Sequence, residues 1–263
     1  MKKIIKNTYR FAKKIPYMGR GATFLRDAYN NSFLKKRSLF AADKKRAHEV
    51  LTLFWGASSP AHAYLDNFIR SPFFKTEFSY GHSGNFDIMM LYSVARIIQP
   101  RVVIETGVAS GRSSMAILHA LAENKKGMLY SIDLPQFYDT KLPEKYITEE
   151  GNTELRGFVP SGKEPGWLVP EELRPRWKLI LGDSNKELPL LLEKLDMADI
   201  FYHDGDHSYK TMFGEFESLW PRLPKGGFLF SDDVKWNDAW KDFMKSKTAF
   251  TSLAYRNFGI IRK

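Results

Sequence analysis

Four ionisable side chains fall within five consecutive positions of this sequence, where an apolar stretch gives way to a helix-like one. They occur in the segment "IFYHDGDHSYK" and are His203, Asp204, Asp206 and His207. Carboxylates crowded at a partly buried position raise one another's pKa values, which is unfavourable unless a cation or a shared proton compensates. The cluster therefore predicts a site that binds positive charge or moves a proton.

The elements around this cluster alternate between strand and helix from about residue 99 onward. The strand-like segments are "RVVIET", "GMLYSIDLP", "WKLILGD", "ADIFYHD" and "GGFLFSDD", and a helical segment follows four of them. The closing segments "AFTSLAY" and "FGIIRK" are typical of an antiparallel pair. Repeated strand–helix units predict an α/β fold with a doubly wound, seven-stranded, mostly parallel sheet. Such sheets bind ligands beyond the carboxyl ends of their strands, which is where the charged cluster lies.

The first of these strands ends in a loop that contains glycine. In "IETGVASGRSS", Glu105 closes the strand, and Gly107 and Gly111 turn the chain into a helix. Glycines let a backbone approach a ligand closely, and a helix N-terminus favours a carboxylate or phosphate group. A dinucleotide fingerprint needs G-x-G-x-x-G, whereas this loop has only G-x-x-x-G, so the motif alone is a weak signal.

Polar side chains also close the second and third strands. Asp133 ends the second strand, where its carboxylate is placed to accept both hydroxyls of a ribose. Asp183 and Ser184 follow the third, where a side chain could reach an adenine amino group. Each of these residues has a simpler interpretation as a strand end or a helix cap. Suitable groups at three successive strand ends favour an adenosine-containing ligand over the simpler interpretations.

From about Tyr80 to the C-terminus the chain resembles class I S-adenosylmethionine-dependent methyltransferases, and within them the small-molecule O-methyltransferases of the catechol and macrolide-sugar types. The resemblance is carried by "IETGVASGRSS", "YSIDLP", "LILGDS", "FYHDGDHSYKT" and "LPKGGFLFSDDV", which occur in the family's order. It implies the Rossmann-like fold of that class and S-adenosylmethionine as cofactor. The residues implied to hold its methionine part, its ribose and its adenine are, in that order, Glu105, Gly107, Gly111 and Ser113, then Asp133, then Asp183.

The same resemblance implies a metal site. Metal-dependent members place one aspartate after the fourth strand and an acidic pair after the fifth, positions taken here by Asp204, Asp232 and Asp233. Three carboxylates with no cysteine suit a hard cation, with Mg²⁺ as the first choice, which would lower the pKa of an acceptor hydroxyl. Asp206 and His207 then become candidate general bases, and the relatives that modify sugars favour Asp206. The alternative interpretation is that Asp206 or His207 caps the next helix and Asp233 begins a loop.

Positive charge is concentrated near the N-terminus. The chain has 263 residues, a formal net charge of +10 and no cysteine, and the excess of Lys and Arg lies in residues 1–46. On a helical wheel, residues 1–15 separate apolar from basic side chains. This separation suits an anionic membrane surface, packing on the domain, a targeting presequence or an acidic partner. Nucleic acid is not expected as a partner, because no basic surface with interleaved aromatic residues continues into the domain.

These patterns divide the chain into a basic N-terminal arm, residues 1–46, and a methyltransferase-like domain, residues 47–263. Within the domain we expect a helical cover over residues 47–98 and a substrate lid over residues 136–176, which are rich in Pro, Gly and charge. No apolar run is long enough to span a bilayer. We therefore expect a cytoplasmic protein, which is peripheral to a membrane if the arm binds one. The formation of a homo-oligomer stays possible.

The sequence thus predicts methyl transfer from S-adenosylmethionine to a hydroxyl of a small molecule, such as a sugar or glycoside, with assistance from Mg²⁺. Two other classes stay open. One is a metal-dependent hydrolase built on the cluster at residues 203–207, which is disfavoured because the six histidines contain no H-x-H sequence. The other is a non-catalytic protein that keeps the nucleotide-binding fold and is tethered by its basic arm.

Overall fold

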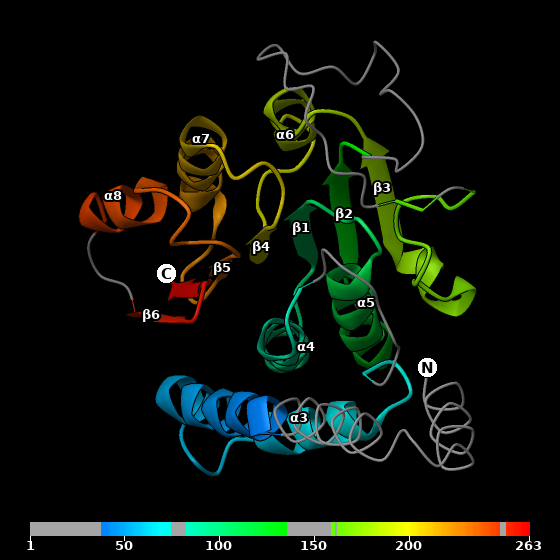
Figure 1. The fold of residues 1–263 in the computed structure, drawn as a ribbon, viewed down its shortest axis with the longest axis vertical. Coiled ribbons are helices and arrows are strands. Elements are labelled where there is room, and N and C mark those ends of the chain that lie inside the picture. The colour runs from blue at the N-terminus through cyan, green and yellow to red at the C-terminus, as the bar shows by residue number, and fades with distance from the viewer. Residues whose placement is uncertain (1–37, 75–82, 136–158, 161, 248–250) are drawn as a thin grey trace, which may run out of the picture. The chain divides into compact units, whose positions relative to one another are not determined.

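The computed structural model describes five stretches of the chain: residues 38–74, 83–135, 159–160, 162–247 and 251–263 (Figure 1). The structure divides into two compact units, Met1–Val50 and Leu51–Lys263. The expected amphipathic helix of the arm and the first part of the expected lid lie outside the described residues. Within the described stretches, no helix is both long enough and apolar enough to cross a bilayer.

A seven-stranded sheet forms the centre of the unit Leu51–Lys263, with the order β3-β2-β1-β4-β5-β7-β6 (Figure 1). Strands β1 to β5 pair in parallel, and β7 pairs antiparallel with both β5 and β6. The strands are β1 Val102–Thr106, β2 Met128–Asp133, β3 Trp177–Leu181, β4 Ile200–His203, β5 Phe228–Ser231, β6 Thr251–Tyr255 and β7 Phe258–Arg262. This is the doubly wound, mostly parallel sheet that the sequence predicts. The strand order reverses between β1 and β4, and such switch points are where these sheets bind ligands.

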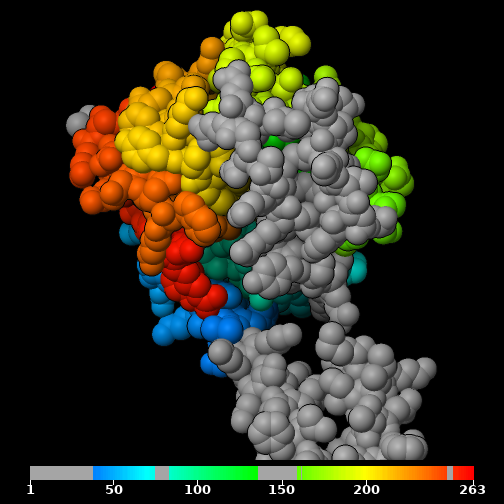
Figure 2. Space-filling model, turned by 45° about the horizontal axis from the view of Figure 1, so that its top comes forward, coloured from blue at the N-terminus to red at the C-terminus, as the bar shows by residue number. Residues whose placement is uncertain are grey.

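Helices cover both faces of the sheet. On one face lie α6 Ser184–Leu192, α7 Tyr209–Leu219 and α8 Ala239–Lys245, and on the other α4 Asn85–Ile98 and α5 Arg112–Asn124 (Figure 1). Every residue of β4 and β5 is buried, as expected for central parallel strands packed on both sides. The apolar stripes of α6, α7 and α8 meet the sheet in one continuous core. Side chains of α7 and α8 lie next to each other at the surface (Figure 2).

The described residues before β1 form a helix over residues 38–55, then α3 Ala61–Arg70 and α4. That residues 47–98 cover the sheet stays a prediction. The first turn of α4 is fixed by Asp87, whose carboxylate accepts a hydrogen bond from the backbone N–H of Gly84 at 2.5 Å. Helices α3 and α4 pack through the rings of Phe68 and Tyr92, which stack with centroids 4.2 Å apart. This packing holds the beginning of α4, and with it Ser83, at the sheet edge that carries the charged cluster.

Candidate active site

The carboxyl ends of β1, β4 and β5 stop at the same level of the sheet. Thr106 is in register with His203, and His203 with Ser231. The ladder continues one step further, because the backbone N–H of Asp204 donates to Thr106 O and that of Asp232 to His203 O, both at 2.8 Å. Backbone pairing therefore brings Asp204 and Asp232 together, although 28 residues separate them in the sequence.

Asp204 and Asp232 form a coupled acidic pair. Asp232 lies close enough to Asp204 to act on it electrostatically, and Asp204 Oδ2 accepts from the Tyr202 hydroxyl at 2.8 Å and the Ser83 hydroxyl at 3.2 Å. Burial and the neighbouring Asp232 raise the pKa of Asp204 well above its ordinary value. Burial raises the pKa of Asp232 as well, against the opposing effect of a hydrogen bond from the backbone N–H of Asp233. Without a cation, the pair therefore retains a shared proton to a higher pH than an isolated aspartate would.

His207 lies next to this pair. Its Nε2 is 3.5 Å from Asp233 Oδ2 and 3.9 Å from Asp204 Oδ1. Burial and the nearby His203 lower the pKa of His207 to about 4, against the opposing effect of the carboxylates. The imidazole is therefore neutral at pH 7 and able to accept a proton from a hydroxyl placed beside it.

Asp233 is placed differently from the other two predicted metal ligands. Its Oδ1 accepts a hydrogen bond from the Asn257 side chain at 2.8 Å, and its Oδ2 faces His207. Its φ of 49° turns the backbone into the left-handed region. In the described stretches, no three His, Cys, Asp or Glu side chains are arranged to hold a metal ion. The predicted set of Asp204, Asp232 and Asp233 is therefore not preformed as a three-ligand site.

Asp206 supports the beginning of α7 but does not cap it, because the N-cap of α7 is Ser208, and the alternative that Asp206 or His207 caps this helix is therefore wrong. Its carboxylate accepts from Ser208 N at 3.1 Å, Ser208 Oγ at 2.8 Å and Thr211 Oγ1 at 2.8 Å, at the beginning of α7. Burial raises the pKa of Asp206, but the hydrogen bonds from Thr211 and Ser208 outweigh it and the net shift is downward. The carboxylate oxygens of Asp206 are thus occupied by these hydrogen bonds, whereas His207 Nε2 faces the acidic pair. Asp206 and His207 both stay candidate general bases, as the sequence predicts.

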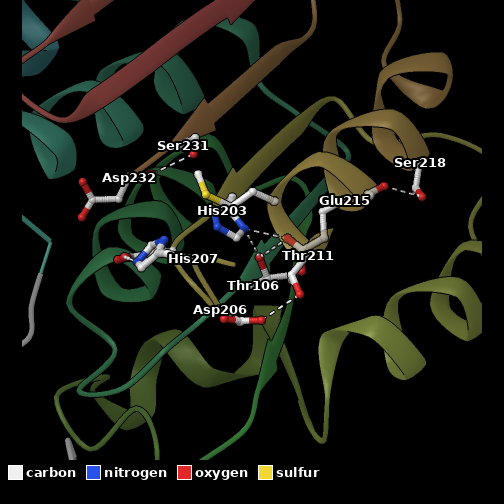
Figure 3. Close-up of polar contacts among 12 residues, drawn as sticks. Thr106, His203, Asp206, His207, Thr211, Glu215, Ser218, Ser231 and Asp232 are labelled. Atoms are coloured by element: carbon white, nitrogen blue, oxygen red, sulfur yellow. Dashed lines mark hydrogen bonds and ion pairs between the residues drawn. The ribbon is translucent and has the colours of Figure 1, made fainter. Parts of the chain in front are cut away.

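A buried polar network lies behind the acidic pair (Figure 3). His203 Nδ1 is 2.7 Å from Glu215 Oε2, which also accepts from Thr106 Oγ1 at 2.8 Å. His203 is fully buried and Glu215 is 4% exposed. His203 Nε2 has no hydrogen-bond partner in the described structure, and the ring lies 5.3 Å from that of His207. The network fixes the orientation of His203 and, through the strand ladder, the position of Asp232.

The glycine loop after β1 is pressed against the acidic pair. Gly107 has φ +85°, and a Cβ at this position would lie 2.0 Å from the backbone oxygen of Asp204. On the other side, Asp133 Oδ1 accepts from the backbone N–H groups of Val108 at 2.8 Å and Ala109 at 3.4 Å. The loop, Asp133 and Asp204 thus form one continuous edge.

Residues 104–234, which contain this whole edge, match the family model described as a methyltransferase domain. This segment is a methyltransferase domain. No curated protein matches the sequence.

Several solved structures share the general arrangement at low identity. The SAH-bound methyltransferase PaMTH1 of Podospora anserina is 15% identical over 83% of this chain and 95% of its own, with a TM-score of 0.48. An O-methyltransferase of Bacillus cereus in complex with SAH is 13% identical over 82% and 96%, with a TM-score of 0.48. The O-methyltransferase TomG of Streptomyces achromogenes, in complex with SAM, is 15% identical over 83% and 97%, also at 0.48.

The methyltransferase domain buries Glu105 and Ser113 instead of presenting them to solvent. The Glu105 carboxylate accepts from the hydroxyls of Ser113 at 2.5 Å, Ser114 at 2.6 Å and Ser131 at 2.6 Å, and it is fully buried. Burial raises the pKa of Glu105 to about 6, although the three hydroxyls oppose the shift. Both side chains are buried in this arrangement, and the cofactor contact expected of Glu105 and Ser113 stays a prediction. Their hydrogen bonds join β1 and β2 to the first turn of α5, directly beneath the glycine loop.

The end of β3 in the methyltransferase domain is built around a helix cap. Asp183 is the N-cap of α6, and its Oδ1 accepts from Asn185 N at 2.9 Å. Ser184 is the first residue of α6, so of the two residues that could be a helix cap, Asp183 is the one that caps it. The cap accounts for one oxygen of Asp183, and the contacts of Asp183 and Ser184 with adenine stay predictions.

Three residues of this site were missed from the sequence. Tyr202 and Ser83 bind Asp204, and Glu215 holds His203. Only Glu215 leaves a signal in the sequence, because a carboxylate on the apolar face of a helix, next to Phe216, needs a buried partner. The position of Ser83 depends on how α4 packs and has no local signature.

Proposed function

We propose that this chain transfers the methyl group of S-adenosylmethionine to a hydroxyl of a small molecule. The observation that carries the proposal is the contact between two functional parts: the glycine loop at Gly107 abuts the backbone of Asp204, which belongs to the acidic pair. A loop suited to the cofactor and groups suited to a hydroxyl therefore meet at the switch point of the sheet. The alternatives, a metal-dependent hydrolase and a non-catalytic binding protein, gain no specific support from this geometry.

The chemistry required is a substitution at carbon. The acceptor oxygen forms a bond to the methyl carbon as the bond between carbon and the sulfonium sulfur breaks, and the hydroxyl proton leaves to a base. In this proposal the neutral His207 accepts that proton, and the proton that Asp204 and Asp232 share is donated in a hydrogen bond to a lone pair of the acceptor oxygen, which holds the hydroxyl beside His207. Correct positioning of the two reacting atoms supplies much of the rate enhancement, commonly several kcal/mol.

The proposal includes assistance from Mg²⁺, held by two carboxylates of the protein. Mg²⁺ is commonly held by one or two carboxylates together with water and substrate oxygens, so Asp204 and Asp232 suffice as protein ligands. The raised pKa values of both residues indicate a deficit of positive charge at this position. When bound, the ion supplies that charge and lowers the pKa of a neighbouring hydroxyl. Asp233 would join only if it gave up its hydrogen bond to Asn257.

An exposed indole beside the site supports a flat or ring-shaped acceptor. Trp236 is 70% exposed, and its ring lies 6.2 Å from that of His207. Its loop is held in place, because Asn237 Nδ2 donates to His207 O at 2.8 Å. A sugar or glycoside that places its apolar ring face on Trp236 would bring a hydroxyl to His207. This contact is the reason for preferring the sugar class among small molecules.

Cofactor binding gives the first test. In the Asp133→Ala variant, S-adenosylhomocysteine is expected to bind at least about tenfold more weakly, because a charge-assisted hydrogen bond to the ribose is lost. Isothermal titration of the full chain measures this affinity. Asp199→Ala is the matched control, since Asp199 also accepts from backbone N–H groups, at the opposite end of β1. Equal affinities for wild type and Asp133→Ala would remove the ribose assignment.

Chelation tests the metal part separately. With EDTA, methyl transfer to a responsive sugar or glycoside is expected to fall at least about a hundredfold, while cofactor affinity changes little, because the ion serves the acceptor oxygen. Mg²⁺ should raise the melting temperature of the wild type but not of Asp232→Asn, since it relieves carboxylate repulsion. Full activity in EDTA would contradict Mg²⁺ assistance, and the acidic pair would then only share a proton.

The function as a whole is tested by thermal shift followed by a transfer assay. S-adenosylmethionine and S-adenosylhomocysteine should each raise the melting temperature of the full chain. Radiolabelled methyl groups should then appear on members of a panel of sugars and glycosides. A response to Mg²⁺ alone would favour the hydrolase, and no response to any of these ligands would favour a non-catalytic protein.

A further inference from the structure

A short segment before β3 is fastened to the glycine loop. We call residues 165–170, the end of the expected lid, the strap. Gly166 N donates to Ala109 O at 2.8 Å, and Leu168 N donates to Ser110 O at 3.0 Å. The strap therefore occupies two carbonyl groups of the loop that the sequence assigns to the cofactor.

The contact between strap and loop depends on two glycines. Gly111 has φ +82°, and a Cβ there would lie 2.7 Å from Gly166 Cα. Gly166 has φ +75°, and a Cβ there would lie 2.1 Å from Trp177 Cη2. Both positions need the left-handed backbone, and neither has room for a side chain. The loop, the strap and the Trp177 ring are thus stacked in direct contact.

Trp177 connects this stack to the buried network beneath the loop. Its Nε1–H donates to Ser131 Oγ at 2.9 Å, and the Ser131 hydroxyl donates to Glu105 at 2.6 Å. Glu105 in turn accepts from Ser113 in the first turn of α5. The indole therefore contacts the strap with its ring and holds the floor of the loop with its nitrogen.

The loop that is held in this way has a strained backbone. Ala109 has φ 45°, an uncommon conformation for a residue with a Cβ. Its N–H donates to Asp133 and its carbonyl accepts from Gly166, so it is fixed from both sides. Strain of this kind persists only where the surrounding structure enforces it, and it is commonly found at ligand sites.

We propose that Trp177 is a positioning residue for the cofactor. Through the strap and Ser131 it keeps residues 107–111 in the conformation that directs Val108 N and Ala109 N to Asp133, so that the loop is preorganised before the cofactor arrives. The inference rests on the proposed function only in naming S-adenosylmethionine as the ligand. The fastening of the loop can be measured without any ligand.

The first experiment removes the indole donor and keeps an aromatic ring. In the full-length Trp177→Phe variant, S-adenosylhomocysteine is expected to bind about five- to tenfold more weakly by isothermal titration, with a melting temperature close to that of the wild type. Trp220→Phe, a substitution of the same kind in the segment between α7 and β5, should bind like the wild type. The double variant Ser131→Ala/Trp177→Phe should lose less binding free energy for S-adenosylhomocysteine than the two single variants together, because both substitutions remove the same hydrogen bond.

The second experiment uses two glycines with similar backbone angles. Gly162 has φ +72° and nothing within 4 Å of an added Cβ, so Gly162→Ala measures the backbone cost alone. Gly166→Ala adds the collision with Trp177, and S-adenosylhomocysteine should bind at least about tenfold more weakly than to Gly162→Ala. Combining Gly166→Ala with Trp177→Leu should restore part of the lost affinity for S-adenosylhomocysteine, because the indole ring that collides with the added Cβ is gone.

Hydrogen exchange separates this inference from the proposed function. Without ligand, the amides of residues 107–111 should exchange faster in Trp177→Phe than in the wild type, while those of β4 and β5 stay unchanged. Unchanged exchange at residues 107–111 would overturn the inference, whether or not the wild type binds S-adenosylhomocysteine. The inference would also be overturned if Trp177→Phe and Gly166→Ala both bound S-adenosylhomocysteine as tightly as the wild type does. Absence of binding by the wild type would refute the proposed cofactor instead.

Discussion

Replacing Asp204 with asparagine is expected to lower the rate of methyl transfer about 10²–10⁴-fold and, at the same time, to raise the melting temperature of the protein at pH 8. The rate falls because the neutral amide neither attracts a cation nor orients the acceptor hydroxyl beside His207. The melting temperature rises because the substitution removes one of two carboxylates that repel each other. Steady-state kinetics and thermal unfolding of the same sample measure both effects.

The pH dependence of this gain has a definite sign. The pKa of Asp204 is raised in the folded state, so the folded protein binds that proton more tightly than the unfolded chain does. The free energy of unfolding of the wild type therefore decreases as the pH rises above about 4, the ordinary value for aspartate. Asparagine does not titrate, so its advantage should be small at pH 4 and large at pH 8. An advantage that shrinks as the pH rises would contradict the shared proton.

Asp206→Asn is the control for this substitution, two positions away in the same loop. Asp206 is exposed and binds the beginning of α7, so its replacement should cost about 1 kcal/mol of stability and change the rate only a few-fold. A loss of about a hundredfold or more in Asp206→Asn would favour Asp206 over His207 as the general base, as the family resemblance implies.

Gly107→Ala is expected to have the largest effect on stability, a loss of about 3 kcal/mol or more. An alanine at φ +85° costs about 1–2 kcal/mol, and its Cβ would lie 2.0 Å from the backbone oxygen of Asp204. The backbone of Asp204, directly after β4, cannot turn aside as a flexible side chain can. Urea unfolding of the full chain, compared with the wild type, gives the value.

Gly56→Ala isolates the conformational part of this cost. Gly56 has φ +83° but nothing within 4 Å of an added Cβ, so it should lose only about 1–2 kcal/mol. Equal losses at Gly56 and Gly107 would mean that the loop moves away from Asp204 easily. The close contact between the glycine loop and the acidic pair would then not be a fixed feature of the site.

The sheet was predictable because its local signals agree with its tertiary environment. Buried parallel strands need continuous apolar runs, and segments such as "ADIFYHD" show them in the sequence. The alternation of strands with helices restricts the topology to a doubly wound sheet. The beginning of α6 could be placed only to within one residue, Asp183 or Ser184, because aspartate and serine cap helices about equally well.

The site was predictable only where it follows strand ends. Asp204 and Asp232 could be placed together because the carboxyl ends of neighbouring parallel strands meet. The role of Glu105 was not predictable, since the same acid in the same position either binds a ligand or accepts three serine hydroxyls, depending on side-chain rotamers. Ser83 and Trp177 act through contacts between distant segments, which leave no pattern in the sequence.

The pairing of β1 with both β2 and β4 bears on how this chain reaches its native state. Val103 pairs with Leu129, a nearby residue, but also with Ile200, almost a hundred positions later. The cofactor side of the sheet therefore needs only β1, β2 and β3, which are complete by Leu181, whereas the acidic pair needs β4, β5 and finally Asn257, which holds Asp233 from the turn between β6 and β7. Loop closure over such separations is slow, because entropy is lost before contacts are gained. During synthesis, the half that holds the cofactor can form while the half that holds the acceptor is still awaiting its last strands.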